Sequence, residues 1–308
     1  MGFICTHQVL LGKEEFRELC LFFTIRNTMN TKNIQLGYYL AGLIEGDGNI
    51  WTPNKFISSN GRKYNPQISF SFDIRDKALF ELLKENFNSG YLCKQKDKNA
   101  GIFRINETNT IITIINLING KFRTPKIMHL HRAIDQINLK HGTEIDKFPV
   151  DKCELSTNAW LAGFTDADGN FHISLEGPYG LNGSLSKGRV KCSFTIVQNM
   201  IYKPTGESCI PFMTEIANLF ECKLNYRKYN ALVFIVGANS KHCLVRNYFD
   251  KYPLMSSKYL NYKDYLKGLD YLGRSLTIKE ISEIQTIKNS MNNKRIFYNW
   301  DHLKSFYK

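Results

Sequence analysis

The stretch "LAGFTDADGNF" at residues 161–171 begins as an apolar helix and ends in two acidic residues, a glycine and an asparagine. The C-terminal end of a helix carries roughly half a negative charge from its unpaired carbonyls, so Asp166 and Asp168 lie at the end that repels them. Taken alone, Asp-Gly before an apolar residue is typical of a tight hairpin turn. The alternative is an arrangement in which another group offsets the negative charge.

A second copy of this stretch, "LAGLIEGDGNI", occupies residues 40–50. The identical positions of the two copies are, in the first copy, Leu40, Ala41, Gly42, Asp47, Gly48 and Asn49. The repeat continues downstream, because Phe72 in "ISFSFDI" and Phe194 in "VKCSFTI" follow Asp47 and Asp168 by 25 and 26 residues. Matching offsets of this kind indicate two duplicated domains.

Each copy is followed by the same order of expected elements: strands, a helix, more strands and another helix. Apolar residues recur at helical spacing along 76–87 and 210–220, and strand-like runs cover 89–96, 101–106, 222–229 and 231–237. We therefore expect an α+β fold of two pseudo-symmetric αββαββα domains, each with an antiparallel sheet covered by helices. The expected boundaries are an N-terminal extension at 1–32, a first domain at 33–139, a Pro149-containing linker at 140–158, and a second domain with a helical tail at 159–308.

The chain is basic, with 41 Lys and Arg against 28 Asp and Glu, a net charge of +13 and a pI near 9.3. This balance favours a polyanionic partner, nucleic acid first, although charge alone does not identify one. Eight cysteines contain no C-x-x-C pair, so neither zinc spacing nor a dense disulfide framework is present. The longest apolar run near the start, "LCLFF" at 19–23, is too short to cross a bilayer, so we expect no membrane partner.

The paired motifs, their separation and the order of the following elements resemble the LAGLIDADG homing endonucleases in their single-chain form with two motifs. The resemblance covers roughly residues 33–270. It implies that the two motif helices pack against each other, and Gly42 with Gly46, and Gly163 with Ala167, place small residues four apart on one face of each helix. Both helix ends would then meet at one place.

The resemblance implies that Asp47 and Asp168 bind a divalent metal, assisted by the backbone carbonyls of Gly46 and Ala167. Two carboxylates facing two negative helix ends are costly unless a cation lies between them. Oxygen ligands suit magnesium, so we expect two or more Mg²⁺ ions at the domain interface. Metal ions beside a phosphodiester can generate hydroxide and stabilise the leaving oxygen, so the expected reaction is hydrolysis of both strands of DNA.

The family also places basic and polar side chains around the attacking water. "LMSSK" and "FRTPK" resemble its lysine regions and nominate Lys258 and Lys126, with solvated or phosphate-binding lysines as the alternative. Gln198 follows "FTIV" where Asp76 follows "FDIR", which makes both candidate water-positioning residues. Because an acid and an amide differ in chemistry, we expect the two strands to be cut at unequal rates.

Alternation along the strand runs predicts a polar sheet face in each half, which by resemblance forms half of a saddle over double-stranded DNA. In "VKCSFTI", Val190, Cys192, Phe194 and Ile196 point inward. The candidate DNA-contacting residues are Lys55, Arg62, Lys63, Gln67, Ser69, Ser71, Lys187, Arg189, Lys191, Ser193, Thr195, Arg227 and Lys228. Two domains, each covering about one turn of roughly 10 bp, predict an asymmetric site of about two helical turns bound by a monomer.

Two other functions stay open at this point. The first is an RNA maturase that assists the folding of intron RNA, and the second is a DNA-binding protein without catalysis. The presence of both acids and both lysines favours a nuclease that promotes intron mobility. Members of this family are commonly encoded in organelles, so the resemblance implies a mitochondrial location. No targeting signal is seen in the sequence.

Overall fold

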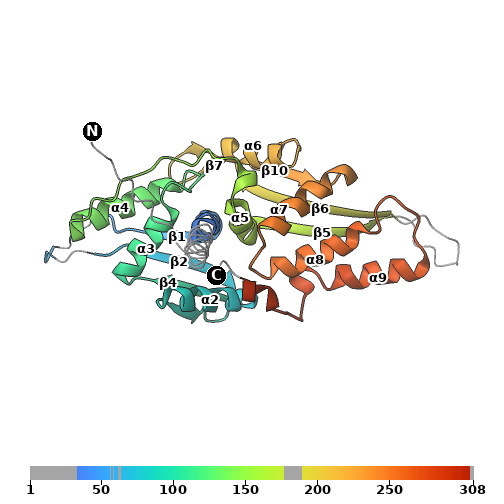
Figure 1. Cartoon of the computed structure of the whole chain (residues 1–308), viewed down its shortest axis with the longest axis horizontal. Coiled ribbons are helices and arrows are strands. Elements are labelled where there is room, and N and C mark those ends of the chain that lie inside the picture. Colours follow the sequence, from blue (N-terminus) through green and yellow to red (C-terminus); the bar gives the residue numbers. More distant parts are fainter. Residues whose placement is uncertain (1–32, 56, 58, 62–63, 177–188, 306–308) are drawn as a thin grey trace, which may run out of the picture.

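The structure is a computed structural model of the chain and describes residues 33–55, 57, 59–61, 64–176 and 189–305. Two halves with a related order of elements lie side by side along the longest axis (Figure 1). Both are mixtures of helices and antiparallel strands, so the predicted α+β class is confirmed. No helix in these described ranges is long and apolar enough to cross a membrane.

The first half begins with a helix at 33–46, which we call the first motif helix. Its remaining elements are β1 (Gly48–Trp51), β2 (Gln67–Asp73), α2 (Lys77–Phe87), β3 (Tyr91–Lys94), β4 (Ala100–Ile105), α3 (Thr108–Ile118) and α4 (Ile127–His141). The second half comprises α5 (Trp160–Asp168), β5 (Gly169–Glu176), β6 (Arg189–Asn199), β7 (Ile201–Tyr202), β8 (Glu207–Ser208), α6 (Ile210–Leu219), β9 (Asn225–Arg227), β10 (Ala231–Val236), α7 (His242–Lys251), α8 (Lys258–Leu269) and α9 (Ile278–Asn289).

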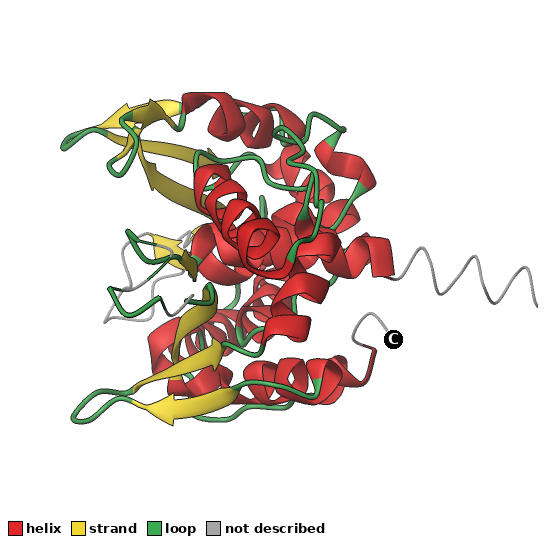
Figure 2. Cartoon of the chain, turned by 90° about the vertical axis from the view of Figure 1, so that its left-hand side faces the viewer, coloured by secondary structure: helices red, strands yellow, loops and turns green. Residues whose placement is uncertain are grey.

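Each half has a four-stranded antiparallel sheet, in the order β1-β2-β4-β3 and β5-β6-β10-β9. Burial alternates along β2 and β6, and Val190, Cys192, Phe194 and Ile196 are all buried, as predicted. Helices cover this apolar face, and Figure 2 shows the strands of both halves on one side of the molecule and most helices on the other. The opposite, polar faces are therefore left without helices.

The structure contains two features that the predicted αββαββα pattern does not include. Helices α4 and α8 follow the expected last helix of each half, and the second half carries the small hairpin β7–β8 between β6 and α6. The apolar positions of α4 recur at helical spacing through Leu130, Ala133, Ile134 and Ile137, all fully buried, so the helix is readable from its pattern. The two-residue strands of β7–β8 are too short to show a period in the sequence.

The first motif helix and α5 pack against each other at the centre of the molecule (Figure 1). A Cβ built on Gly46 would lie 2.1 Å from the Cβ of Ala167, a distance that no real side chain tolerates. Only small residues therefore allow the helices to come this close, which is the packing that the family resemblance implies. The apolar residues of both halves form one continuous core around this contact.

Candidate active site and nucleic-acid interface

Asp47 and Asp168 lie at the adjoining C-terminal ends of the two motif helices. Asp168 is the last residue of α5, and Asp47 follows the first motif helix, with its N–H donating to the carbonyl of Leu43 at 3.1 Å. A Cβ built on Gly46 would lie 3.4 Å from Oδ2 of Asp168, so this carboxylate reaches the end of the helix from the other half. The structure thus brings together the two acids predicted from the repeat.

A lysine closes the end of each motif helix. Lys126 precedes α4 and donates from Nζ to the carbonyls of Ile44 at 3.2 Å, Gly46 at 2.7 Å and Gly48 at 3.0 Å. Lys258 begins α8 and donates to the carbonyls of Thr165, at 3.2 Å, and Ala167. The two ammonium groups therefore offset the partial negative charge of the helix ends. Without them, this charge would disfavour acidic residues at these positions.

The acids and lysines form one electrostatic unit. Burial raises the pKa of Asp47, the nearby Asp168 carboxylate raises it further, and Lys258 and Lys126 oppose both effects. Asp47 stays exposed on its outer side, so solvent screens part of this interaction. Burial likewise raises the pKa of Asp168. Burial lowers the pKa of Lys126 and Lys258, and the nearby carboxylates oppose this effect.

Gln198 and Asp76 occupy related positions but make different contacts. Gln198 donates from Nε2 to Oδ2 of Asp168 at 2.7 Å. Asp76 accepts a hydrogen bond from the N–H of Ser257 at 2.7 Å, next to Lys258, and burial raises the pKa of its carboxyl. Gln198 thus touches a candidate metal ligand directly, whereas Asp76 contacts the loop of a lysine from the other half.

The oxygens at this place suit a hard divalent cation. Two carboxylates of like charge face each other beside the carbonyls of Gly46 and Ala167, and hard cations such as magnesium take oxygen ligands of this kind. Among the described residues, no group of three or more His, Cys, Asp or Glu is placed to hold a metal ion. The two carboxylates and two carbonyls therefore fit a divalent cation.

The other acid of each motif points away from this pair. Glu45 and Asp166 are buried, with 4% and 6% exposure, and accept hydrogen bonds from backbone N–H groups of the loops before Lys126 and Lys258. Their contacts could not be found in the sequence, because the loops lie 78 to 90 residues away.

Most candidate DNA-contacting residues lie on the polar sheet faces. Gln67, Ser69 and Ser71 share the face of β2 that is opposite its buried phenylalanines, and Arg189, Lys191, Ser193 and Thr195 share that of β6. Arg227 pairs with Ala231 on the same side, while Lys55 and Lys228 lie exposed in turns. Arg62, Lys63 and Lys187 lie outside the described residues.

Sequence reasoning missed two further residues of the polar face in the first half. Arg104 on β4 is directly opposite Ser69, and Trp51 on β1 is directly opposite Gln67. Directly paired residues point to the same side of an antiparallel sheet, so both belong to the candidate interface. Their place on this face follows only from the strand register, which the sequence alone does not give. On β6, Lys191 forms an exposed ion pair with Glu176 at 2.5 Å.

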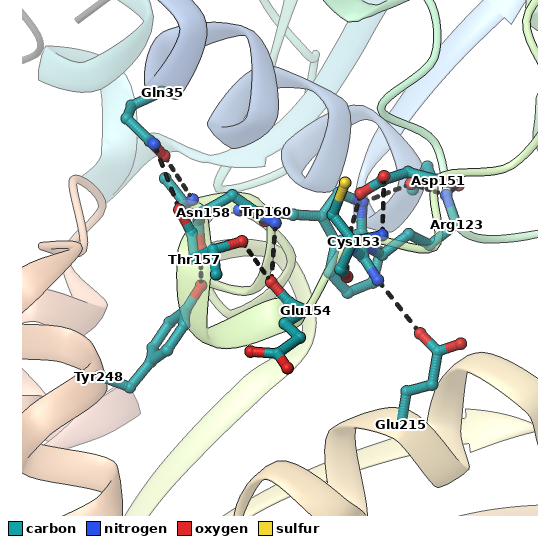
Figure 3. A network of polar contacts seen from close by, with 12 residues as sticks. Gln35, Arg123, Asp151, Cys153, Glu154, Thr157, Asn158, Trp160, Glu215 and Tyr248 are labelled. Atoms are coloured by element: carbon teal, nitrogen blue, oxygen red, sulfur yellow. Dashed lines mark hydrogen bonds and ion pairs between the residues drawn. The ribbon is translucent and has the colours of Figure 1, made fainter. Parts of the chain in front are cut away.

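A network of polar contacts joins the two halves beside the linker (Figure 3). The buried guanidinium of Arg123, at the end of the first half, pairs with Asp151 of the linker and with Glu215 of α6 at 3.1 Å. It also lies 5.8 Å from the ring centre of Trp160. Gln35 of the first motif helix accepts from the N–H of Ala159 at 2.9 Å, which ties the two helices together at their other ends.

A sequence profile described as "LAGLIDADG endonuclease" matches residues 40–135 and 161–269. The intron-encoded DNA endonuclease aI3 of Saccharomyces cerevisiae is 31% identical over 310 residues, which cover 89% of this chain and 73% of that protein. A shorter match, 27% identical over 147 residues, covers 47% of this chain and 20% of the intron-encoded RNA maturase bI4 of the same yeast.

The fold has close counterparts among solved structures. The LAGLIDADG homing endonuclease I-LtrWI bound to its target DNA superposes with a TM-score of 0.60 at 20% sequence identity. The match covers 85% of this chain and 99% of that one.

Proposed function

Because this chain belongs to the LAGLIDADG endonuclease family, we propose that it is a homing endonuclease that cuts both strands of a long, asymmetric DNA site. The observation that carries this proposal is the meeting of Asp47 and Asp168 at the paired helix ends, with Lys126 and Lys258 beside them. The sheets of both halves lie on one side of the molecule (Figure 2), and the polar faces of β2 and β6 would offer the duplex a surface.

Asp47 and Asp168, with the carbonyls of Gly46 and Ala167, would hold divalent cations, for which we propose Mg²⁺. A bound cation would lower the pKa of a water molecule and stabilise the charge that develops on the cleaved phosphodiester. Lys126 and Lys258 keep the loops and helix ends together through their carbonyl contacts, and their ammonium groups add positive charge where phosphates bind. Gln198 orients the Asp168 carboxylate and can hold a water beside it.

The exposed basic residues of the interface are proposed to contact phosphates, and the polar side chains of β2 and β6 to contact base edges. A two-stranded ribbon fits the major groove, where each base pair shows a distinct set of donors and acceptors. The chain would act as a monomer, since both halves of the site come from one polypeptide. Intron-encoded relatives in yeast support a mitochondrial location.

Plasmid cleavage tests this proposal. The protein is incubated with Mg²⁺ and plasmids carrying candidate intron-insertion sequences, alongside Asp47→Asn and Asp168→Asn variants. We expect a linear product from the parent, and a loss of at least about 100-fold in each variant, since removing a metal ligand costs roughly 3 kcal/mol of transition-state stabilisation. DNA affinity measured in Ca²⁺ should change little.

Specific cleavage that survives both substitutions would contradict the assignment of the acids. The resemblance to an RNA maturase supports a second candidate function, the binding of intron RNA. Tight binding to the intron transcript, without cleavage of any tested DNA, would favour that function over the nuclease.

A further inference from the structure

The buried acids of the two motifs make matching contacts in the two halves. Both oxygens of the Glu45 carboxylate accept from the N–H of Arg123 at 3.0 Å, and Oε1 also accepts from the N–H of Thr124 at 2.6 Å. Asp166 accepts from the N–H of Met255 at 2.7 Å and from the hydroxyl of Ser256 at 2.5 Å. In both halves the contacted residues stand three and two positions before the lysine.

Each of these acids also accepts one hydrogen bond from the opposite half. Nε1 of Trp160 in α5 donates to Oε2 of Glu45 at 2.6 Å. The phenol of Tyr39 in the first motif helix donates to Oδ2 of Asp166 at 2.8 Å. Trp160 and Tyr39 stand one residue before the motif that begins at Leu161 or Leu40, so the exchange is reciprocal and follows the internal symmetry.

We propose that Glu45 and Asp166 are positioning residues, which fix the loop of the lysine in their own half and are themselves held by an aromatic donor from the other half. Each half-site is then set jointly by both domains. A hydrogen bond in a buried place is strong and directional. Each loop is also bonded to the motif helix of its own half by its lysine. The inference rests on the proposed nuclease function for its kinetic consequence.

The consequence is a crossed dependence. Removing the phenol of Tyr39, in the first half, should disturb the loop of Lys258 in the second half. Removing the indole N–H of Trp160 should disturb the loop of Lys126 in the first half. A general loss of packing at the helix contact affects both loops together. Because the Trp160 ring also lies beside the Arg123 guanidinium, Tyr39→Phe is the cleaner of the two tests.

Amide hydrogen exchange of the free protein, without DNA or metal, tests the structural part. Tyr39→Phe should speed exchange at Met255 and leave Arg123 and Thr124 unchanged, relative to the amides of β4. Trp160→Phe should speed exchange at Arg123 and Thr124 and leave Met255 unchanged. Because Trp160→Phe also reduces packing, Glu45→Gln, which keeps the shape of the carboxylate, should reproduce its pattern. For Tyr39→Phe or Trp160→Phe, faster exchange only in the loop of the substituted half, or equally in both loops, would overturn the proposal.

Strand-resolved single-turnover cleavage tests the kinetic part. The variants Lys126→Ala and Lys258→Ala first identify which strand depends on which half-site. Tyr39→Phe should then slow the strand that Lys258→Ala slows, on the order of 10-fold, as is common for residues that orient catalytic groups. Trp160→Phe should slow the other strand, and DNA affinity should stay within about twofold of the parent.

The matched control is Tyr248→Phe, which removes another buried phenol, donating at 2.8 Å to the carbonyl of Asn158 and not to a motif acid. It should slow neither strand selectively. Equal slowing of both strands by Tyr39→Phe would contradict the inference. If the parent protein cuts no DNA at all, the nuclease function fails, and the crossed pattern of amide exchange decides the inference by itself.

Discussion

The backbone of Gly42 lies directly against that of Trp160, so closely that a Cβ built on Gly42 would come within 2.0 Å of the Trp160 carbonyl oxygen. The mirrored contact places a Cβ on Gly163 within 1.9 Å of the carbonyl oxygen of Tyr39. Neither oxygen is the end of a flexible side chain. The helices would have to separate to accept a methyl group, and the carboxylates at their ends would separate with them.

Gly42→Ala or Gly163→Ala should therefore lower the free energy of unfolding by about 3 kcal/mol or more, because overpacking against backbone relaxes poorly. Urea denaturation followed by circular dichroism measures the change. The control is Gly237→Ala, where an added Cβ meets only a side-chain methyl of Ile235 at 3.9 Å. A loss in the control as large as in the motif variants would contradict the packing argument.

Replacing Arg123 tests the polar network beside the linker. Its side chain is 2% exposed and its partner Asp151 is 5% exposed, so Arg123→Met leaves a buried carboxylate without its cation. Such a change costs about 3 to 5 kcal/mol of stability. The same denaturation experiment should show a loss within about 1 kcal/mol for Glu215→Gln, because the Glu215 side chain is 48% exposed and solvent screens its ion pair.

Salt dependence tests the candidate DNA interface. Arg227→Gln should reduce the slope of log affinity against log salt by about 0.9, the value expected for one lost phosphate contact. Filter binding in Ca²⁺ at several salt concentrations measures it. Lys77→Gln is the control, since Lys77 is exposed on α2 and paired with Glu81 at 2.8 Å. An unchanged slope for Arg227→Gln would place that residue outside the interface.

Acid stability should depend on His242. Its ring is buried and its Nδ1 lies 2.6 Å from the hydroxyl of Tyr265, and burial lowers the pKa of the imidazole. Below about pH 6.5, the ordinary value, the unfolded chain takes up a proton that the folded ring does not. The free energy of unfolding should therefore fall as the pH falls through this window, and the contribution of His242 is fully present above it.

Melting curves between pH 5 and pH 7.5 check this expectation. His242→Gln should make the melting temperature less dependent on pH over that window than it is in the parent. His141→Gln, at the exposed end of α4, serves as the control. The prediction fails if both variants keep the full pH dependence of the parent.

Much of the fold can be predicted from the sequence because the two copies of the repeat can be compared with each other. Two copies of one motif, and Phe72 and Phe194 at matching distances, were enough to predict paired domains. The meeting of Asp47 with Asp168 was implied by the resemblance to the family. The polar and apolar faces of β2 and β6 followed from alternation, because a strand has a period of two. These properties are local or periodic, and both kinds are visible in one sequence.

The remaining features depend on contacts between distant segments. Nothing near Glu45 shows that it will accept from backbone groups of residues 123 and 124, since backbone donors are the same at every position. Arg104 needed the strand register. Gln198 and Asp76 were nominated for a related role from aligned positions, which carry no information on their partners. Asp76 contacts the loop of Lys258, whereas Gln198 contacts Asp168 itself.

The reciprocal aromatic–acid contacts also bear on how such a chain can evolve. The phenol oxygen of Tyr39 stands farther from its backbone than the indole nitrogen of Trp160, and it meets the shorter acid, Asp166, while Trp160 meets the longer acid, Glu45. A dimer of two first halves would pair the long donor, Tyr39, with the long acid, Glu45. A dimer of two second halves would pair the short donor, Trp160, with the short acid, Asp166. Each half is therefore the specific complement of the other, so an exchange of halves between such genes would have to carry both contacts along.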